Sequence, residues 1–462
     1  MNAPTSLCRA PELRDWLAHL HRTGRLAIAR PGAGLMHEIA GIANRLDGTA
    51  ATAFPDAGGG GMTVVSGLLS DRDWMAEALG VDRAGLVAAF QHAAAHPLPW
   101  REVTEAPCQQ VVVEEGDLLG RLPIPTHNEH DSGAYITAGL LIARNPRTGV
   151  QNVAIHRLQV SGPRELGVLL LPRHTLAFFA AAEAEGHDLD VAIVVGCSPA
   201  CLMASQAILP IDRDELEVAG ALYGAPLAVA RCIGSEIRVP AEAEIVIEGR
   251  LLARRRAPEG PFGEFPQYYG ERAERHVIAV DRLTHREAPL FHTIVGGGLE
   301  HLLLGALPRE ATILNTLQSS FPGVRAVHLT LGGVGRYHLV VQLHQTSRGE
   351  AKNVILGAFA AHYDIKHVVV VDGDVDIHDA RSVAWAVATR FQADRDLVVV
   401  GGAQGSKLDP STEDGFGAKM GLDATVPPGA PEFRFTRIRV PGQEAIDLGA
   451  VIDAGAGLEG IL

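Results

Sequence analysis

The apolar pattern of this chain changes character twice, and this limits the folds that the chain can adopt. Helix-type and strand-type spacings alternate at the beginning, short runs of β-branched residues between Gly, Pro and Asn/Asp clusters fill the middle, and the alternation returns at the end. The length of 462 residues also exceeds the usual size of one hydrophobic core. We therefore predict an α/β domain at 1–105, a β-barrel or sandwich at 106–305, and a second α/β domain at 306–462.

The spacing of apolar residues also predicts individual elements. Helices are expected at 13–20, 36–46, 74–79, 175–185, 350–362 and 380–391. Strands are expected at 26–29, 62–69, 111–114, 136–143, 153–160, 192–195, 237–239, 326–331, 337–343, 367–371 and 397–400. The Gly- and Pro-rich segment from Gly401 onward is expected to form mostly loops.

Composition excludes several classes of protein. Hydrophobic residues make up 47% and charged residues 20%, which is typical of a globular chain. The net charge is 40 − 54 = −14, so we expect no nucleic-acid partner. No apolar run approaches the roughly 20 residues of a membrane helix and no signal-peptide core is present, which predicts a cytoplasmic protein without a membrane partner. The cysteines form no CxxC pair, as expected in a reducing compartment: Cys8, Cys108, Cys197, Cys201 and Cys232.

The segment 256–270 carries two carboxylates in a Gly-, Pro- and aromatic-rich setting. Glu259 and Glu264 are separated by residues that favour a tight, irregular backbone. Paired carboxylates in apolar surroundings are candidates for acid/base chemistry, because desolvation and mutual repulsion raise a pKa. A surface turn with solvated glutamates would give the same pattern.

A permanently charged residue, Arg157, lies within an apolar strand pattern at 151–160. This placement suggests a carboxylate or anionic ligand as its partner. Strand alternation puts Asn152 and Arg157 on opposite faces unless a bulge intervenes. An exposed arginine on an edge strand would also fit the pattern.

Further polar residues offer donors for a cation or a phosphate. Asn152, His174 and Glu215 supply oxygen and nitrogen ligands suitable for Mg²⁺ or Mn²⁺, although their spacing is not a metal signature. Glu215 also fits the first turn of a helix. Lys419, in the Gly-rich stretch 415–425, suits a single phosphate, and a plain glycine turn fits the same stretch.

Five motifs occur in an order that resembles UbiD-type decarboxylases. They are Asn152–Arg157, Asp214–Leu222, Val239–Gly249, Pro258–Phe265 with the following tyrosine pair, and Gly417–Thr425. The resemblance implies a central split β-barrel of the flavin-reductase kind between two α/β domains, the last of which helps to form a homodimer or larger homo-oligomer. It also implies prenylated FMN as cofactor, supplied by a flavin prenyltransferase, with Mn²⁺ or Mg²⁺ and K⁺ at its phosphate.

The resemblance assigns roles to individual residues. It implies Arg157, Glu259 and Glu264 as the catalytic set, and Asn152, His174 and Glu215 as metal ligands, with Arg173 as an alternative to His174. Further cofactor contacts carry over to Val153, Ala154, Ile155, Ser205, Gln206 and Lys419.

The implied reaction is the reversible, non-oxidative decarboxylation of an aromatic or heteroaromatic acid. In this hypothesis Arg157 orients the carboxylate, Glu259 donates the proton and Glu264 sets the charge state. His301 and Arg309 resemble a pair that binds the second carboxylate of furan dicarboxylates, but Pro308 prevents their assignment to one helix face, and an interdomain salt bridge would also explain them. The sequence is also compatible with a 4-hydroxybenzoate or polyprenyl-hydroxybenzoate decarboxylase, a non-catalytic prenyl-FMN-binding protein, or a hydrolase.

Overall fold

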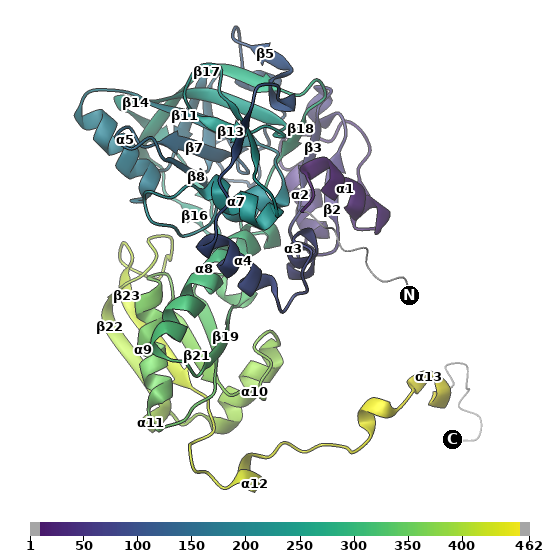
Figure 1. The fold of residues 1–462 in the computed structure, drawn as a ribbon, viewed down its shortest axis with the longest axis vertical. Coiled ribbons are helices and arrows are strands. Elements are labelled where there is room, and N and C mark those ends of the chain that lie inside the picture. Colours follow the sequence, from purple (N-terminus) through teal and green to yellow (C-terminus); the bar gives the residue numbers. More distant parts are fainter. Residues whose placement is uncertain (1–9, 453–462) are drawn as a thin grey trace.

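The computed structural model describes residues 10–452 and has a mixed α/β fold with several sheets. Figure 1 shows the N-terminal and central parts side by side at one end of an elongated molecule and the C-terminal α/β part at the other. Helix α8 (Leu299–Ser320) lies between them and packs against α4, α9 and β19. Groups from both ends of the molecule therefore meet along this helix.

The N-terminal part forms a four-stranded sheet covered by helices. The sheet order is β1-β2-β3-β18, with β1 (Leu26–Ile28), β2 (Ala51–Phe54), β3 (Thr63–Ser66) and β18 (Leu290–His292). Its helices are α1 (Leu13–Arg22), α2 (Glu38–Leu46), α3 (Arg72–Ala78) and α4 (Leu86–Ala95). The helices and strands predicted here are confirmed, but strand β18 enters from the far end of the central segment and pairs in parallel with β3.

The central part is built on one nine-stranded sheet. Its order is β6-β9-β10-β17-β14-β11-β7-β8, and β5 pairs with β17. The strands are β5 (Val111–Val113), β6 (Tyr135–Ile136), β7 (Leu140–Arg144), β8 (Gln151–Ile155), β9 (Leu158–Gly162), β10 (Glu165–Val168), β11 (Leu189–Val195), β14 (Ile245–Glu259) and β17 (Ala273–His285). Within residues 10–452 no pairing joins β6 to β8, so the predicted barrel is not closed.

Smaller elements complete the central part. A three-stranded sheet combines β4 (Arg101–Val103), β12 (Ala228–Arg231) and β13 (Arg238–Pro240), and a short hairpin pairs β15 (Phe262–Gly263) with β16 (Tyr269–Gly270). The helices are α5 (His174–Ala184), α6 (Pro199–Ala204) and α7 (Glu215–Tyr223). The helix predicted at 175–185 is therefore confirmed.

Two strands predicted as continuous are each divided in two. The predicted strand 136–143 breaks between β6 and β7, and 153–160 breaks between β8 and β9 at His156 and Arg157. A chain that leaves its ladder for two residues can turn successive side chains out of the strict alternation. This break answers the question of which face Arg157 occupies, since both His156 and Arg157 line the cavity described below.

The C-terminal part is a five-stranded sheet between helices. The order is β19-β20-β21-β23-β22, with β19 (Val324–Leu329), β20 (His338–Leu343), β21 (His367–Val371), β22 (Leu397–Gln404) and β23 (Phe416–Asp423). Helices α8 and α9 (Glu350–Ala361) bury one face, and α10 (Ala380–Arg390) covers the other. The remaining helices are short: α11 (Ala393–Asp396), α12 (Glu432–Phe435) and α13 (Leu448–Val451).

The prediction of loops beyond Gly401 is wrong for β23 and for the end of β22. Strand β23 is an interior strand, hydrogen bonded to β21 and β22 on its two sides. Its glycines hide the apolar pattern because α9 packs closely there: a side chain at Gly421 would collide with Ile355. Beyond β23 only short helices such as α12 and α13 occur in the described residues, as expected.

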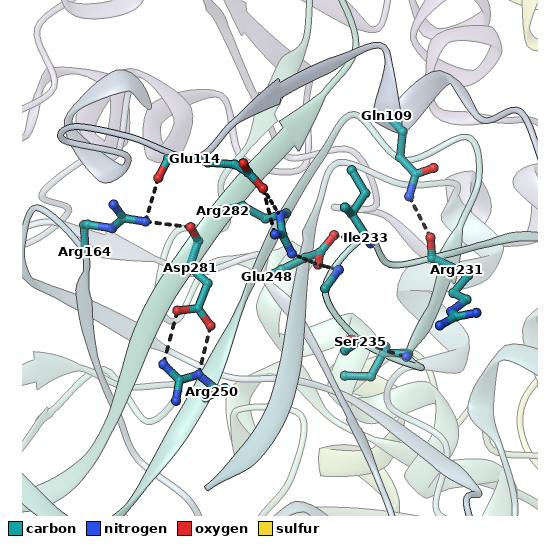
Figure 2. Close-up of polar contacts among 12 residues, drawn as sticks. Gln109, Glu114, Arg164, Arg231, Ile233, Ser235, Glu248, Arg250, Asp281 and Arg282 are labelled. Atoms are coloured by element: carbon teal, nitrogen blue, oxygen red, sulfur yellow. Dashed lines mark hydrogen bonds and ion pairs between the residues drawn. The ribbon is translucent and has the colours of Figure 1, made fainter.

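Ion pairs connect strands of the central sheet through residues that do not line the cavity (Figure 2). Arg282 on β17 bridges Glu114 at 2.7 Å and Glu248 at 3.3 Å. Glu248 also accepts backbone hydrogen bonds from the turn between β12 and β13. Arg250 on β14 pairs with Asp281 at 3.0 Å. These contacts join β5, β14 and β17, and we assign them a structural role.

The described cysteines are free and buried: Cys108, Cys197, Cys201 and Cys232. Cys8 lies outside the described residues. Between residues 10 and 452 no helix is both long and apolar enough to cross a membrane.

Candidate active site

A cavity of about 490 Å³ lies between the central sheet and the C-terminal part. Its volume falls in the range of small-molecule sites, roughly 300–1,000 Å³. Groups from the central part, from α8 and from C-terminal loops share its wall, and the charged or titratable ones include Arg157, Arg173, Glu264, His301, Arg309, Arg336 and Asp364. Among the described residues, none of the N-terminal part contributes to the wall.

The predicted catalytic residues Arg157, Glu259 and Glu264 are brought together. The Nη2 of Arg157 donates to Oε2 of Glu259 at 2.8 Å, and its Nη1 donates to Oε1 of Glu264 in a short contact. The guanidinium lies over the ring of Phe262 at 5.4 Å. The paired glutamates are therefore not a solvated surface turn, and Arg157 is not an exposed edge arginine.

The two glutamates differ in their access to the cavity. Glu264 lines the wall, whereas Glu259 is 0% exposed and stands behind Arg157, with its Oε1 accepting from the Tyr135 hydroxyl at 3.2 Å. The proton-donor role expected for Glu259 does not fit this geometry, because both of its oxygens are engaged and neither faces the cavity.

Electrostatics support the same distinction. Burial raises the pKa of Glu264, and the Arg157 guanidinium opposes this shift without cancelling it. Burial alone lowers the pKa of Arg157, but Glu264 and Glu259 reverse the direction and raise it. The raised pKa favours the protonated form of Glu264 relative to an ordinary glutamate.

Backbone flexibility at two glycines allows the loop to wrap around Arg157. Gly260 has φ +87°, and a Cβ there would lie 2.9 Å from the carbonyl oxygen of Glu271. A Cβ at Gly270 would lie 3.0 Å from Nη1 of Arg157. Gly260 and Gly270 therefore let the 256–270 segment fold closely around Arg157.

The expected metal ligands meet only in part. Nδ2 of Asn152 donates to Glu215 at 3.0 Å, the backbone N–H of Val153 donates to the other Glu215 oxygen at 2.7 Å, and Thr175 donates to Oδ1 of Asn152 at 2.8 Å. Glu215 begins α7 and is 2% exposed, and burial raises its pKa to about 8. A buried carboxylate beside an amide is a donor set that suits a hard divalent cation.

His174 stands apart from this pair. Within the described residues it forms no hydrogen bond or ion pair with Asn152 or Glu215, and no cluster of three His, Cys, Asp or Glu side chains suited to a metal exists in residues 10–452. Burial lowers the pKa of His174, and Arg173 lowers it further. Arg173 itself turns toward the C-terminal part and donates to the Tyr363 hydroxyl at 3.0 Å.

The remaining expected cofactor contacts divide into two groups. Ile155, Arg173 and Gln206 line the cavity, whereas Val153, Ala154, Ser205 and Lys419 do not. The Ser205 hydroxyl donates to a carbonyl oxygen of its own helix at 2.7 Å. Lys419 on β23 is 6% exposed and donates to the Tyr363 carbonyl oxygen at 2.8 Å, behind the cavity wall.

His301 and Arg309 lie on one continuous helix, α8, which contains Pro308 in its interior. Both side chains line the cavity, so the proline does not separate them. Arg309 donates to the Gly305 carbonyl oxygen at 2.7 Å, and its Nε stands 3.8 Å from Asp364 in the C-terminal part. Both residues lie in the predicted domain 306–462, so this contact at the cavity wall is not the interdomain salt bridge considered from the sequence.

Several residues of the site were not predicted from the sequence. Arg336 is 5% exposed and lies 4.7 Å above the ring of Phe265, and a side chain at Gly305 would collide with it. Asp364 and Tyr135 were also missed. A lone arginine directly after the Gly-rich stretch 332–335 is the only local signal for Arg336. Asp364 lies in the turn between α9 and β21 and Tyr135 lies in β6, and neither is marked by a local motif.

Comparison with known proteins decides the family. The 3-octaprenyl-4-hydroxybenzoate carboxy-lyase family models match at residues 17–94 (N-terminal domain), 101–299 (Rift-related domain) and 302–424 (C-terminal domain). The chain belongs to the UbiD family. It is therefore a decarboxylase, as its motifs predict.

The similar proteins include a named decarboxylase and two solved structures of a UbiD-class enzyme. The chain is 43% identical over 321 residues to an anhydromevalonate phosphate decarboxylase of Methanothermobacter thermautotrophicus, covering 69% of this chain and 75% of the relative. It is 46% identical, with a TM-score of 0.94, to the UbiD-class enzyme HmfF from Pelotomaculum thermopropionicum in complex with FMN, covering 96% of this chain and 100% of that one. An evolved dimeric form of HmfF in complex with prFMN gives 43% identity and a TM-score of 0.89, covering 96% and 100% of the two chains.

Proposed function

We propose that this UbiD-family enzyme reversibly decarboxylates a small heteroaromatic acid that carries a second anionic group, of which a furan dicarboxylate is the preferred example. One observation carries the proposal: the same cavity presents the Arg157–Glu264 pair and a second cationic group made by Arg309 and Arg336. Buried arginines without a hydrogen-bonded carboxylate favour an anionic ligand.

Prenylated FMN with Mn²⁺ or Mg²⁺ and K⁺ is the proposed cofactor set, supplied by a flavin prenyltransferase. The cavity volume and its apolar and cationic wall fit a flavin, with Ile155, Arg173 and Gln206 as contacts. Asn152 and Glu215 are the proposed metal ligands, with His174 as the third. When bound, the prenylated flavin supplies the electron sink that a carbon losing CO₂ requires.

The residues of the chain bind the acid and move one proton. Arg157 binds and orients the carboxylate that is lost, through charge-assisted hydrogen bonds. Glu264 replaces Glu259 as the proposed proton donor, because it lines the cavity and burial raises its pKa. Glu259, held by Tyr135, positions Arg157.

A phosphorylated unsaturated acid is the second candidate substrate. The name of the relative from Methanothermobacter thermautotrophicus includes a phosphate, and the Arg309–Arg336 group would also attract phosphate. A hydroxybenzoate substrate gains nothing from two further cations. A protein that only stores flavin would not need the Arg157, Glu259 and Glu264 set. A hydrolase would not need the flavin contacts.

We also propose the domain boundaries 1–105, 106–305 and 306–462, with the central domain as an open split barrel, a cytoplasmic location, and a C-terminal domain that forms a homodimer or larger homo-oligomer. The similarity to a dimeric form of HmfF supports the oligomer, as do the exposed apolar residues Val399 and Phe416 on β22 and β23.

CO₂ release from furan, pyrrole, indole and benzoic carboxylic acids tests the function. The enzyme is produced with and without the flavin prenyltransferase, and we expect activity only in the prenylated preparation, highest with a dicarboxylate. Equal activity without prenylation would overturn the cofactor proposal, and inactivity across the panel with modified flavin bound would overturn the substrate proposal.

A further inference from the structure

The cationic group of the cavity is assembled from three separate segments. Arg309 and His301 lie on α8, Arg336 precedes β20, and Asp364 precedes β21. Because these side chains share one wall, the sum of their charges determines which second anionic group the site accepts.

His301 contributes no charge near neutral pH. Burial, Arg336 and Arg309 lower its pKa to about 3, and its Nδ1 accepts the backbone N–H of Gly297 at 3.3 Å. Burial lowers the pKa of Arg309 and of Arg336 as well. A guanidinium nevertheless stays protonated in proteins, so these two residues bring two positive charges.

Asp364 brings one negative charge to the same group. Its carboxylate is 7% exposed and lies 3.8 Å from Nε of Arg309 and 3.9 Å from Nδ1 of His362. Burial and the surrounding cations lower the pKa of His362 to about 3, so His362 is neutral. Arg336 makes only long contacts with carbonyl oxygens, at 3.5 and 3.4 Å, and keeps its charge available.

We propose that Asp364 sets the net charge of this subsite to one positive charge and thereby selects a carboxylate over a phosphate as the second anionic group of the substrate. The inference rests on the function proposed above. A carboxylate balances the site, whereas a phosphate monoester carries about −1.5 to −2 near pH 7 and would place excess negative charge beside Asp364.

The other charged groups on the cavity wall or near it contact other residues. Lys407 lines the cavity and pairs with Asp414 at 2.8 Å. Glu264 pairs with Arg157. Arg173 is exposed and bonded to the Tyr363 hydroxyl, and Lys419 is bonded to the Tyr363 carbonyl oxygen behind the wall. In the described part of the chain neither cation forms a hydrogen bond or ion pair with Asp364, although the charge of Asp364 opposes the lowering of the Lys419 pKa by burial.

Three furan acids that differ only at the 5-position measure this preference: 2-furoate, furan-2,5-dicarboxylate and 5-phosphono-2-furoate. Their dissociation constants for the flavin-loaded enzyme are obtained by calorimetric titration at pH 7.5. The unsubstituted enzyme is expected to bind the dicarboxylate at least about tenfold more tightly than the phosphonate. Asp364→Asn is expected to shift this ratio toward the phosphonate by at least about tenfold, because it removes the repelling charge.

Two variants control for structure. Asp364→Glu keeps the charge and is expected to keep the preference for the dicarboxylate. Asp372→Asn removes another carboxylate of the C-terminal part, and this change is expected to leave the ratio unchanged. Asp372 does not line the cavity, and it pairs with Arg390 at a distance of 2.8 Å. Unchanged affinity for 2-furoate and unchanged flavin content show that each variant is folded.

The outcomes separate the two proposals. A ratio that does not respond to Asp364→Asn, in an enzyme that binds the dicarboxylate more tightly than 2-furoate, overturns the role of Asp364 alone. If neither of the two acids with a second anionic group binds the unsubstituted enzyme more tightly than 2-furoate does, the proposed second-anion function fails, and the role of Asp364 fails with it.

Discussion

At the scale of single residues, the chemistry depends on which carboxyl group reaches the cavity. Glu264 and Glu259 bind the same guanidinium, yet only Glu264 lines the wall. Sequence motifs identify both residues and Arg157, because the Gly- and Pro-rich segment between the two glutamates is conspicuous. They do not assign the roles, since access to a cavity depends on how the loop packs against Tyr135 and Phe262.

Glu264→Gln is expected to lower kcat by about 10²–10⁴-fold, the usual contribution of a general acid. The amide keeps the shape of the side chain but has no acidic proton that it could transfer to carbon. CO₂ release and flavin absorbance are measured together, and flavin binding is expected to be unchanged. Glu271→Gln, an exposed substitution at the end of the same loop, is the control. A fully active Glu264→Gln enzyme would contradict the assignment.

At the scale of elements, α8 has one face toward the cavity and another anchored on the N-terminal part. The backbone N–H of Leu299 donates to Asp47 at 2.7 Å, and Glu300 accepts from the backbone N–H of Gly67 at 2.9 Å. Near its middle, Glu310 pairs with Arg72 at 2.7 Å in a fully buried contact. The N-terminal part therefore holds the helix that carries His301 and Arg309.

Arg72→Met is expected to lower the free energy of unfolding by about 3–5 kcal/mol, because it leaves Glu310 as a buried charge without its main partner. The double variant Arg72→Met/Glu310→Leu is expected to recover part of this loss, since no unpaired charge remains. Urea unfolding measures both. Arg83→Met breaks an exposed pair with Asp73 on α3, the helix that also carries Arg72. It should lower the free energy of unfolding by no more than about 1 kcal/mol. Equal effects of Arg72→Met and Arg83→Met would contradict the anchor.

Elements with a sustained apolar period could be predicted from the sequence. Elements in which packing against a neighbour requires glycine, or in which a helix continues through a proline, could not. Helices α1, α5, α9 and α10 match their predicted ranges closely. Strand β23 was missed because glycines stand where α9 packs against it, and α8 was not predicted as one helix because Pro308 normally ends a helix.

At the scale of the whole molecule, distant segments create the site. Arg336 and Asp364 have no local motif that marks them, and they reach the cavity only because the C-terminal sheet packs beside α8. Their contribution could not be predicted without the tertiary structure. The motif residues around Arg157 could be, because each lies in a short, recognisable stretch of sequence.

Stability is expected to fall as the pH decreases from about 6.5 to about 4. Burial lowers the pKa of six described histidines to about 3 or 4, so the unfolded chain binds protons in this window that the folded chain does not. Each fully buried histidine such as His127 is expected to lower the free energy of unfolding by about 1–2 kcal/mol when the pH falls from 7 to 5. Seven described carboxyl groups have raised pKa values, which act in the opposite direction: Asp47, Asp190, Asp214, Glu215, Glu264, Asp372 and Asp423. Six others have lowered pKa values, which act in the same direction as the histidines: Glu77, Glu183, Glu310, Glu350, Asp374 and Asp409.

Urea midpoints at pH 7, 6 and 5 measure this dependence. His127→Asn removes one titrating group and is expected to flatten the curve, while His130→Asn, at an exposed position, should leave its slope unchanged. A stability that rises toward pH 5 would contradict the prediction.

The ratio of kcat/KM for furan-2,5-dicarboxylate to that for 2-furoate tests the central claim most directly, because it asks whether the cavity recognises a second anionic group. In the prenyl-FMN-loaded enzyme we predict a ratio of at least about 10, which Arg309→Gln brings close to 1 while Arg325→Gln, at an exposed position on β19, leaves it unchanged. A ratio near 1 in the unsubstituted enzyme, or one that Arg309→Gln does not alter, would contradict the account.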